Sequence, residues 1–283
     1  VRRGTPAGEA PAPVGEDLPP EAWPDLPEGL QRLLAAQQVL VREGLLDAPT
    51  GIRLRPIPHG FLFVGSGPDG RRVPFYECFG HFLETLNLAV EERRYDVLVV
   101  APPRGRPLPR WLRGDAARRL ALNLHTSLLV VRGGGLDGRW VICADDSPSA
   151  RRIFPLLRPL LPAMPRALEM VCVQRGAEAQ EAGPLEGRCL RKAREWLETC
   201  GKEVRSHHLK AAEPLGPIVA HAGREAMVVM GESLRHDVYR RVVGSLPIQF
   251  LGASEASLLL VKLPPEAEGE LFGEAFTCNE DAD

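Results

Sequence analysis

The sequence contains an internal repeat that aligns without a gap. Residues 96–132 fall on residues 226–262 at a constant offset of 130 positions. Two apolar runs and one glycine keep this register: 97–100 on 227–230, 128–132 on 258–262, and Gly114 on Gly244. Two strand-like runs and a glycine rarely match in one register by chance. A fixed period of this kind predicts two copies of one structural unit.

A helix repeats at a second offset, of 157 positions. Leu33, Ala36, Leu40 and Gly44 fall on Leu190, Ala193, Leu197 and Gly201. Each glycine stands where a helix C-cap needs a left-handed residue. The change of offset gives the first copy about 27 extra residues, in which two β-type runs, 61–64 and 72–75, flank the turn 65–70. We expect an inserted hairpin. A phosphate loop is the alternative for the turn, but no helix opens directly after it and it contains no Lys.

The second copy reads as alternating strands and helices. Strands are expected at 140–144, 168–173, 203–207, 227–230 and 257–262, with helices after Ser147 and at 190–200, 217–223 and 246–251. Such alternation predicts a parallel sheet covered on both faces. Pro155 and Pro159 should kink or split the helix that follows Ser147. The two strands 128–131 and 258–261 are expected to meet at a seam between the copies, because both would otherwise be apolar edges.

The fold class expected is therefore α/β, with two doubly wound parallel-sheet units. The first is incomplete, because nothing in it matches residues 138–187. We divide the chain into a Pro-rich leader (1–27), a degenerate first copy carrying the hairpin (28–134), a more complete second copy (138–264) and an acidic tail (265–283). The 283-residue length agrees with about two domains.

Composition excludes several classes of protein. Hydrophobic residues make up 44% and charged residues 25% of the chain, proportions of a globular protein with real cores. No run approaches the roughly 18 apolar residues of a spanning helix, so we expect a cytoplasmic protein without a membrane partner. Its 35 basic residues do not exceed its 37 acidic ones, which argues against nucleic-acid binding. The six cysteines form no CxxC pair, so reduced thiols are expected.

Candidate ligand-binding residues follow the strands of the second copy. Open parallel sheets bind ligands beyond the carboxyl ends of their strands, where strand order reverses. The first strand ends at Asp145, whose carboxylate could accept ribose hydroxyls, and the fourth runs into Gly231, where a ligand can approach the backbone. Gly244 and Ser245 open a helix, whose free amides suit phosphate.

These residues resemble the universal stress protein family, in particular its tandem members. The resemblance rests on two segments. Residues 141–147 match the opening strand and its acid, and Gly231 with Gly244 and Ser245 matches the G-2X-G-9X-G-(S/T) signature. The resemblance implies a Rossmann-like, adenine nucleotide alpha hydrolase-like fold, with ATP or a related adenine nucleotide as ligand and a role in stress response. By position, Asp145 would hold ribose and Val173 would line the adenine site. Gly231, Gly244 and Ser245 would wrap the phosphates.

Departures from the family pattern are also present. Leu234 replaces the middle glycine of the signature, and Asp146 follows the acid where the family usually has glycine. The first copy has Ala101, Arg104 and Asp115 at the signature positions, so no nucleotide is expected there. The alternative function is a structural or interaction protein of the same fold that binds no nucleotide, and self-association is an expected property of either.

No catalytic residues are expected. An ATP pyrophosphatase of similar architecture would need an SGGxDS-type loop after the first strand, and residues 145–149 do not supply it. His207, His208 and His221 have no ligand-like partner four residues on, so packing or surface positions are preferred to metal ligation and no metal site is expected.

Overall fold

The structure is a computed structural model. It describes residues 17–57, 60–78, 82–92, 95–100, 120–122, 124, 126–132, 138–144, 150, 153–174, 188–232 and 245–262. The chain divides into two compact units, Val1–Arg93 and Arg94–Asp283. This boundary lies inside the span 28–134, which the sequence analysis assigned to one copy. Among the described residues, no helix is both long enough and apolar enough to cross a membrane.

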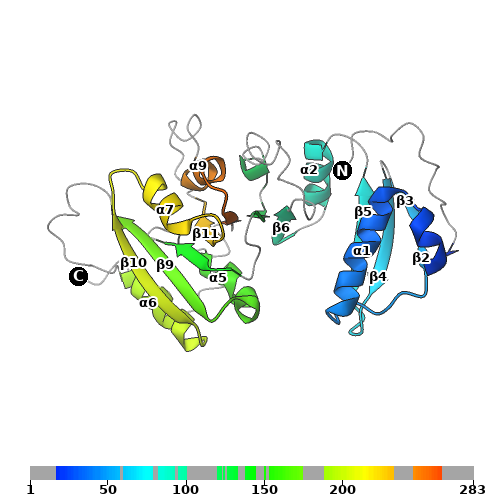
Figure 1. Cartoon of the computed structure of the whole chain (residues 1–283), viewed down its shortest axis with the longest axis horizontal. Helices are drawn as coiled ribbons and strands as arrows, with labels where there is room; N and C mark the ends of the chain where they lie inside the picture. The colour runs from blue at the N-terminus through cyan, green and yellow to red at the C-terminus, as the bar shows by residue number, and fades with distance from the viewer. Residues whose placement is uncertain are drawn as a thin grey trace. The chain divides into compact units, whose positions relative to one another are not determined.

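The second unit is built on one seven-stranded sheet (Figure 1). Its strands are β6 (Val97–Val100), β7 (Ser127–Val130), β8 (Trp140–Cys143), β9 (Ala167–Gln174), β10 (Glu203–Lys210), β11 (Met227–Gly231) and β12 (Ser257–Val261). The order across the sheet is β10-β9-β8-β11-β12-β7-β6. All neighbours are parallel except β12 and β7, which are antiparallel. The predicted α/β class with a mainly parallel sheet is confirmed.

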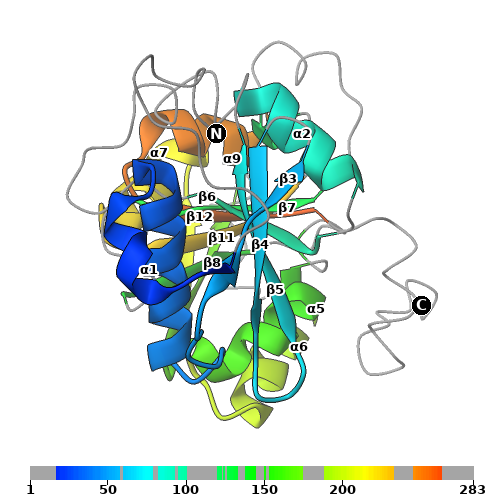
Figure 2. The same ribbon diagram turned by 90° about the vertical axis from the view of Figure 1, so that its right-hand side faces the viewer.

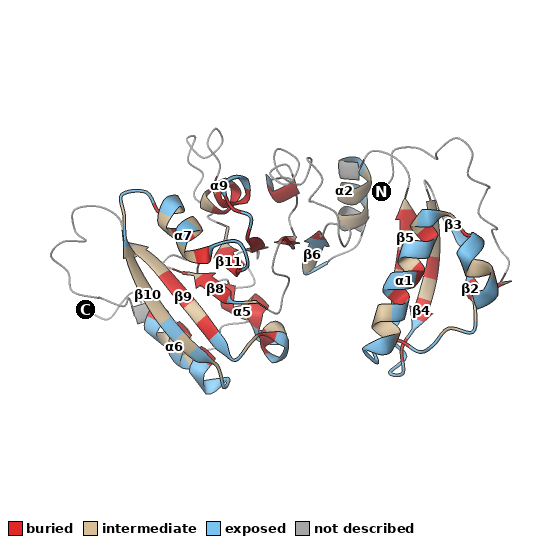
Figure 3. Ribbon diagram, viewed as in Figure 1, coloured by how far each residue is buried: buried red, intermediate tan, exposed pale blue. Residues whose placement is uncertain are grey.

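The two copies share this sheet instead of forming two sheets. β6 and β7, which belong to the first copy in sequence, extend the sheet of the second copy beyond β12. Every residue of β12 is buried, and Figure 3 shows the buried residues concentrated in the central strands. A wholly apolar strand at an open edge would pair with other chains, so a covering strand is required.

The helices of the second unit agree with the predicted ones. They are α5 (Ile153–Leu157), the 3-10 helix Arg158–Ala163, α6 (Arg188–Thr199), α7 (Leu215–Ala222) and α9 (Leu246–Ala253). Pro155 and Pro159 fall in the first two of these, and the split predicted for this helix is confirmed. In Figure 1, α5 and α6 lie on one face of the sheet, and α7 and α9 lie on the other.

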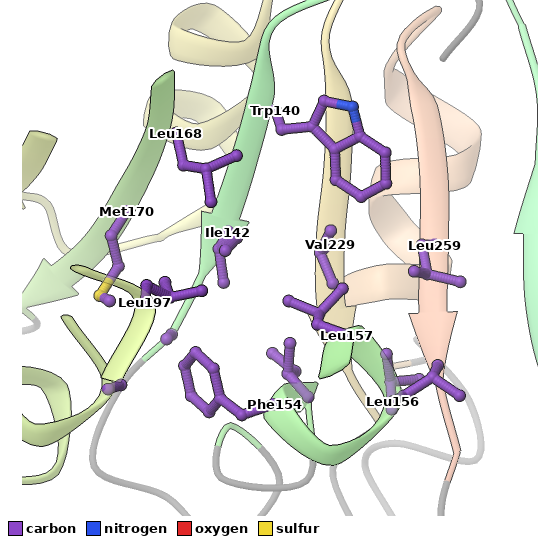
Figure 4. Close-up of a cluster of buried hydrophobic side chains, with 14 of the residues drawn as sticks. Trp140, Ile142, Phe154, Leu156, Leu157, Leu168, Met170, Leu197, Val229 and Leu259 are labelled. Atoms are coloured by element: carbon purple, nitrogen blue, oxygen red, sulfur yellow. The ribbon is translucent and has the colours of Figure 1, made fainter. Parts of the chain in front are cut away.

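The face beneath α5 and α6 holds the larger core (Figure 4). Ile142, Val229 and Leu259 project from three neighbouring strands, and Leu157 and Leu197 reach them from the helices. Strand residues two apart share a face, which explains why alternate residues of each strand enter this core. Burying side chains of this size contributes roughly 1.5–3 kcal/mol each to folding.

The antiparallel pair of β7 and β12 is arranged about the repeat. Leu129 lies opposite Leu259, its counterpart 130 positions on, and the flanking pairs exchange in the same way. The predicted seam between these two strands is confirmed. The basic residue that follows each strand, Arg132 or Lys262, is buried and donates hydrogen bonds to main-chain carbonyls of the other copy. The acceptors are Leu251 and Ser254 for the first, and Ala121 and Leu124 for the second. These acceptors also differ by 130 positions, so the contacts are reciprocal.

The first unit has a different architecture (Figure 2). Its elements are β1 (Asp17–Leu18), the 3-10 helix Pro20–Asp25, α1 (Glu28–Arg42), β2 (Ile52–Arg53), β3 (Arg55–Ile57), β4 (Gly60–Ser66), β5 (Arg72–Cys78) and α2 (Phe82–Glu92). β3, β4 and β5 form an antiparallel sheet, and β1 pairs with β2. The predicted hairpin is confirmed as β4 and β5, with Phe63 stacked on Phe75 at 4.8 Å between ring centroids.

Helices α1 and α6, which match in sequence, have the same C-cap but pack on different sheets. Gly44 and Gly201 follow the two helices with φ of 70° and 80°, so the predicted left-handed C-caps are confirmed. However, α1 packs on the antiparallel sheet through Leu30 and Leu34, whereas α6 packs on a parallel one. The shared spacing therefore reflects two amphipathic helices of similar length, each with its own core.

Candidate functional site

The candidate site lies where strand order reverses in the second unit. From β8 the chain proceeds to β9 and β10 on one side, and it returns to β11 and β12 on the other. The crevice at such a switch point, beyond the carboxyl ends of the strands, is where open α/β sheets bind ligands. After β8 the last described residue is Ala144, whose N–H donates to the Val171 carbonyl at 3.0 Å. After β11 the last described residue is Glu232, and its N–H donates to the Val261 carbonyl at 2.9 Å.

Ser245 begins α9 at this edge of the sheet. Helix α9 connects two parallel strands, β11 and β12, so its amino end lies at their carboxyl edge. The Ser245 carbonyl accepts from the N–H groups of Ile248 and Gln249, at 2.9 and 3.0 Å. The residue is only 8% exposed, yet its hydroxyl makes no cap hydrogen bond, and Oγ has no partner in the described part of the chain. Leaving a buried hydroxyl without a partner costs roughly 1–3 kcal/mol.

Three of the five predicted site residues are described. Val173 is half-buried near the carboxyl end of β9, Gly231 ends β11, and Ser245 precedes α9, so all three belong to the same edge of the sheet. Asp145 and Gly244 lie outside the described residues. So do Asp146 and Leu234, the departures from the family pattern, and the first-copy positions Ala101, Arg104 and Asp115.

A cysteine also ends a strand at this crevice. Cys143 is the last residue of β8, and burial raises the pKa of its thiol to about 12. A thiol with such a pKa remains protonated at neutral pH, and the protonated form is neither a nucleophile nor a metal ligand. Burial therefore disfavours the reactive thiolate form of Cys143.

A second polar group of side chains was not expected from the sequence, which favoured packing or surface positions for His207 and His221 and did not join them to Glu169. Glu169, His207 and His221 come from β9, β10 and α7, and their ligand atoms lie within 4.8 Å of one another. Spacing along the chain cannot join residues from three elements. The one available signal was Glu169 itself, a carboxylate inside an otherwise apolar strand run.

Comparison with known proteins gives structural matches only. No protein-family model and no curated protein matches the sequence. Solved structures do match. The chain is similar to universal stress proteins. A universal stress protein from Archaeoglobus fulgidus DSM 4304 shares 17% identity at a TM-score of 0.49, over 67% of this chain and 68% of that one. A universal stress protein solved in complex with cAMP shares 19% identity at a TM-score of 0.34, over 44% of this chain and 95% of that one. The fold assignment rests on the strand order described above.

Proposed function

We propose that the second copy binds an adenine nucleotide, ATP or a relative of it, and that the protein is a universal-stress-type binding module in stress response. The observation that carries this proposal is Ser245. Its hydroxyl is buried at the amino end of α9, at the edge of the sheet where β8 and β11 end, and it has no hydrogen-bond partner among the described residues. Phosphate oxygens would accept from this hydroxyl, and the free amides of a helix amino terminus favour anions.

The remaining roles are assigned by position. Asp145 follows β8 and would accept hydrogen bonds from the ribose hydroxyls. Val173, half-buried on β9, would contact the adenine ring. Gly231 and Gly244 flank the loop between β11 and α9, and the absence of a side chain there lets the backbone approach phosphate. We assign binding and no catalytic step to this set.

We further propose that the chain is a tandem arrangement in which only the second copy holds nucleotide. The reciprocal bonds of Arg132 and Lys262 support an equivalence of the two copies about the seam. Three of the four signature positions of the first copy depart from the pattern, as Ala101, Arg104 and Asp115, and the Asp115 carboxylate would repel a phosphate. The nucleotide would therefore be bound once per chain.

One observation favours the alternative, an interaction protein of the same fold. Among the described strands, β6 pairs only with β7, and Val99 on it is 56% exposed. An apolar residue exposed on an edge strand is a place where another chain can add. Self-association or partner binding through β6 would need no ligand in the crevice.

A pair of serine variants tests the nucleotide proposal. Ser245→Ala removes the hydroxyl without a partner, whereas Ser254→Ala removes a hydroxyl at the other end of α9 that accepts from the Ala256 N–H at 3.1 Å. Calorimetric titration with ATP, and with cAMP as a second adenine nucleotide, should show affinity reduced about ten- to hundredfold for Ser245→Ala, because a hydrogen bond to a charged group contributes about 1.5–3 kcal/mol. Ser254→Ala should bind as wild type.

Stability measurements separate a lost ligand contact from a damaged fold. Without nucleotide, Ser245→Ala should unfold at the same urea concentration as wild type or a higher one, since no hydrogen bond is lost. Ser254→Ala should be less stable by about 1 kcal/mol. Mass spectrometry of the purified protein would identify any nucleotide that co-purifies. If folded protein gave no heat of binding with either nucleotide, the nucleotide proposal would be rejected in favour of the interaction protein.

A further inference from the structure

The cluster of Glu169, His207 and His221 lies away from the nucleotide crevice. Glu169 is the third residue of β9, in the amino-terminal part of the strand, and His221 lies in the last turn of α7. Residues at these positions lie at the amino ends of the parallel strands, whereas Ser245 lies at their carboxyl ends. The three side chains meet because β9 and β10 are parallel neighbours and α7 packs on β9.

Glu169 is the centre of the cluster. Its Oε2 lies 2.7 Å from Nε2 of His221 and 3.5 Å from Nε2 of His207. The two imidazole rings lie 4.6 Å apart and are tilted by 56°. The first distance is a hydrogen bond and the second is not. Within the described ranges, Nε2 of His207 is buried without a hydrogen bond, although the Glu169 carboxylate faces it.

These distances fit a small divalent cation. Zn²⁺ binds imidazole nitrogen and carboxylate oxygen at about 2.0–2.2 Å, so neighbouring ligand atoms of a tetrahedral site lie roughly 3.3 Å apart. The 3.5 Å separation of Glu169 and His207 already has this size, and the 2.7 Å separation of Glu169 and His221 would need to open by well under 1 Å. The ligand atoms of the two imidazoles lie within 4.8 Å of each other and would need to approach by up to about 1.5 Å. Two imidazoles and one carboxylate form a known zinc ligand set, with water at the fourth position.

Arg139 holds the carboxylate in place. Its Nη1 donates to both oxygens of Glu169 at 3.1 Å, and its Nη2 donates to the carbonyls of His221 and Ala222 at the end of α7. Burial opposes ionisation of Glu169, but the hydrogen bonds from His221 and Arg139 outweigh it, and the pKa of the carboxyl is lowered. The guanidinium charge disfavours a cation, yet the side chain is 43% exposed and engages the negative end of the α7 dipole, and both features weaken the repulsion.

Access to the cluster is partial. The side chains of Glu169 and His221 are 17% and 16% exposed, and that of His207 is 37% exposed. Such a site is shielded enough to strengthen metal–ligand bonds and open enough for an ion and a water molecule to enter.

We propose that Glu169, His207 and His221 bind Zn²⁺ or a similar divalent transition-metal cation. The alternative for the same residues is a hydrogen-bonded cluster that only exchanges protons. Metal binding would tie β9, β10 and α7 together, so the ion would stabilise the outer strand of the sheet.

Zinc titration of the full chain, freed of metal with a chelator, tests the proposal. Wild type is expected to bind one Zn²⁺ through this cluster and to melt at a higher temperature with the ion than without it. Glu169→Gln, His207→Gln and His221→Gln should each weaken binding at least about tenfold, as changes at metal sites do. His208→Gln is the matched control, because successive strand residues point to opposite faces and His208 faces away from the cluster.

Cobalt provides a second measurement. Co²⁺ bound in place of Zn²⁺ should show the visible absorption of tetrahedral coordination, and this signal should be absent from His207→Gln. Melting curves without metal establish that each variant is folded. Wild type with a Kd for Zn²⁺ above about 100 μM, or three cluster variants that bind Zn²⁺ as tightly as wild type, would overturn the proposal. Ser245→Ala should leave zinc binding unchanged, so this test is independent of the nucleotide proposal.

Discussion

The seam between β7 and β12 makes a quantitative prediction about Arg132. This arginine is only 6% exposed, and its guanidinium donates to two carbonyls at the end of α9. Replacing it with methionine keeps most of the apolar stem and removes all of the donors. The main-chain N–H of residue 132, which donates to Ser257 Oγ at 2.9 Å, is retained by this substitution.

The expected cost is worked out from the two bonds to Leu251 and Ser254. A hydrogen bond from a charged group contributes about 1.5–3 kcal/mol, and a buried carbonyl left without its donor adds a desolvation penalty. The favourable position of a cation at a helix carboxyl end adds about 0.3–1 kcal/mol. Water entering the vacated space would recover part of this loss. We therefore expect Arg132→Met to lower the free energy of unfolding by about 2–5 kcal/mol.

Urea unfolding of the full chain measures this loss. Arg166→Met is the matched control, since that arginine pairs with Glu203 at 2.9 Å but is 79% exposed, and such surface pairs contribute about 0–1 kcal/mol. Lys262→Met should resemble Arg132→Met, because its bonds are the reciprocal ones and its Nζ also pairs with Glu232 at 3.2 Å. If Arg132→Met were as harmless as Arg166→Met, the reciprocal bonds would not hold the two copies together.

Three further predictions concern other parts of the chain. Phe63→Ala should destabilise the hairpin unit by about 3–5 kcal/mol in thermal unfolding, because Phe63 is 1% exposed and stacks on Phe75. Alkylation followed by mass spectrometry should modify the exposed Cys200 and spare Cys143, whose pKa burial raises to about 12. The pKa of Glu169 is lowered, so its contribution to stability is present above about pH 4.5 and is lost as the pH falls through the folded-state pKa. Acid unfolding of Glu169→Gln should therefore depend less on pH than that of wild type.

Much of the second unit could be predicted from the sequence because its elements are locally encoded. β11 and β12 are apolar runs bounded by polar residues, and the prolines of the helix between β8 and β9 mark where it splits. The partition of the chain was harder to predict. Helix α1 has the periodicity of α6, and periodicity specifies an apolar face without specifying the sheet that covers it. The unit boundary at Arg93 and Arg94 depends on tertiary contacts that no local pattern contains.

The candidate sites differ in the same way. Ser245 could be found because a glycine–serine pair at the start of a helix is a local motif. That its hydroxyl is buried without a partner is known only from the packing around α9. Glu169, His207 and His221 are separated by 38 positions or 14 positions along the chain, and only the parallel pairing of β9 with β10 and the packing of α7 bring them together.

The seam also explains why the two copies match in their strands and not in their loops. All five residues of β12 are buried, and this burial depends on β7, which in turn lies between β12 and β6. Apolar residues in 97–100 and 127–130 are therefore needed for the stability of the shared sheet whether or not the first copy binds anything. The glycines of a phosphate loop are needed only where a ligand approaches the backbone. A copy that completes the sheet and holds no nucleotide would keep its apolar runs and could lose signature residues. Residues 96–132 keep the apolar runs and Gly114, and they carry Ala101, Arg104 and Asp115 at the other signature positions.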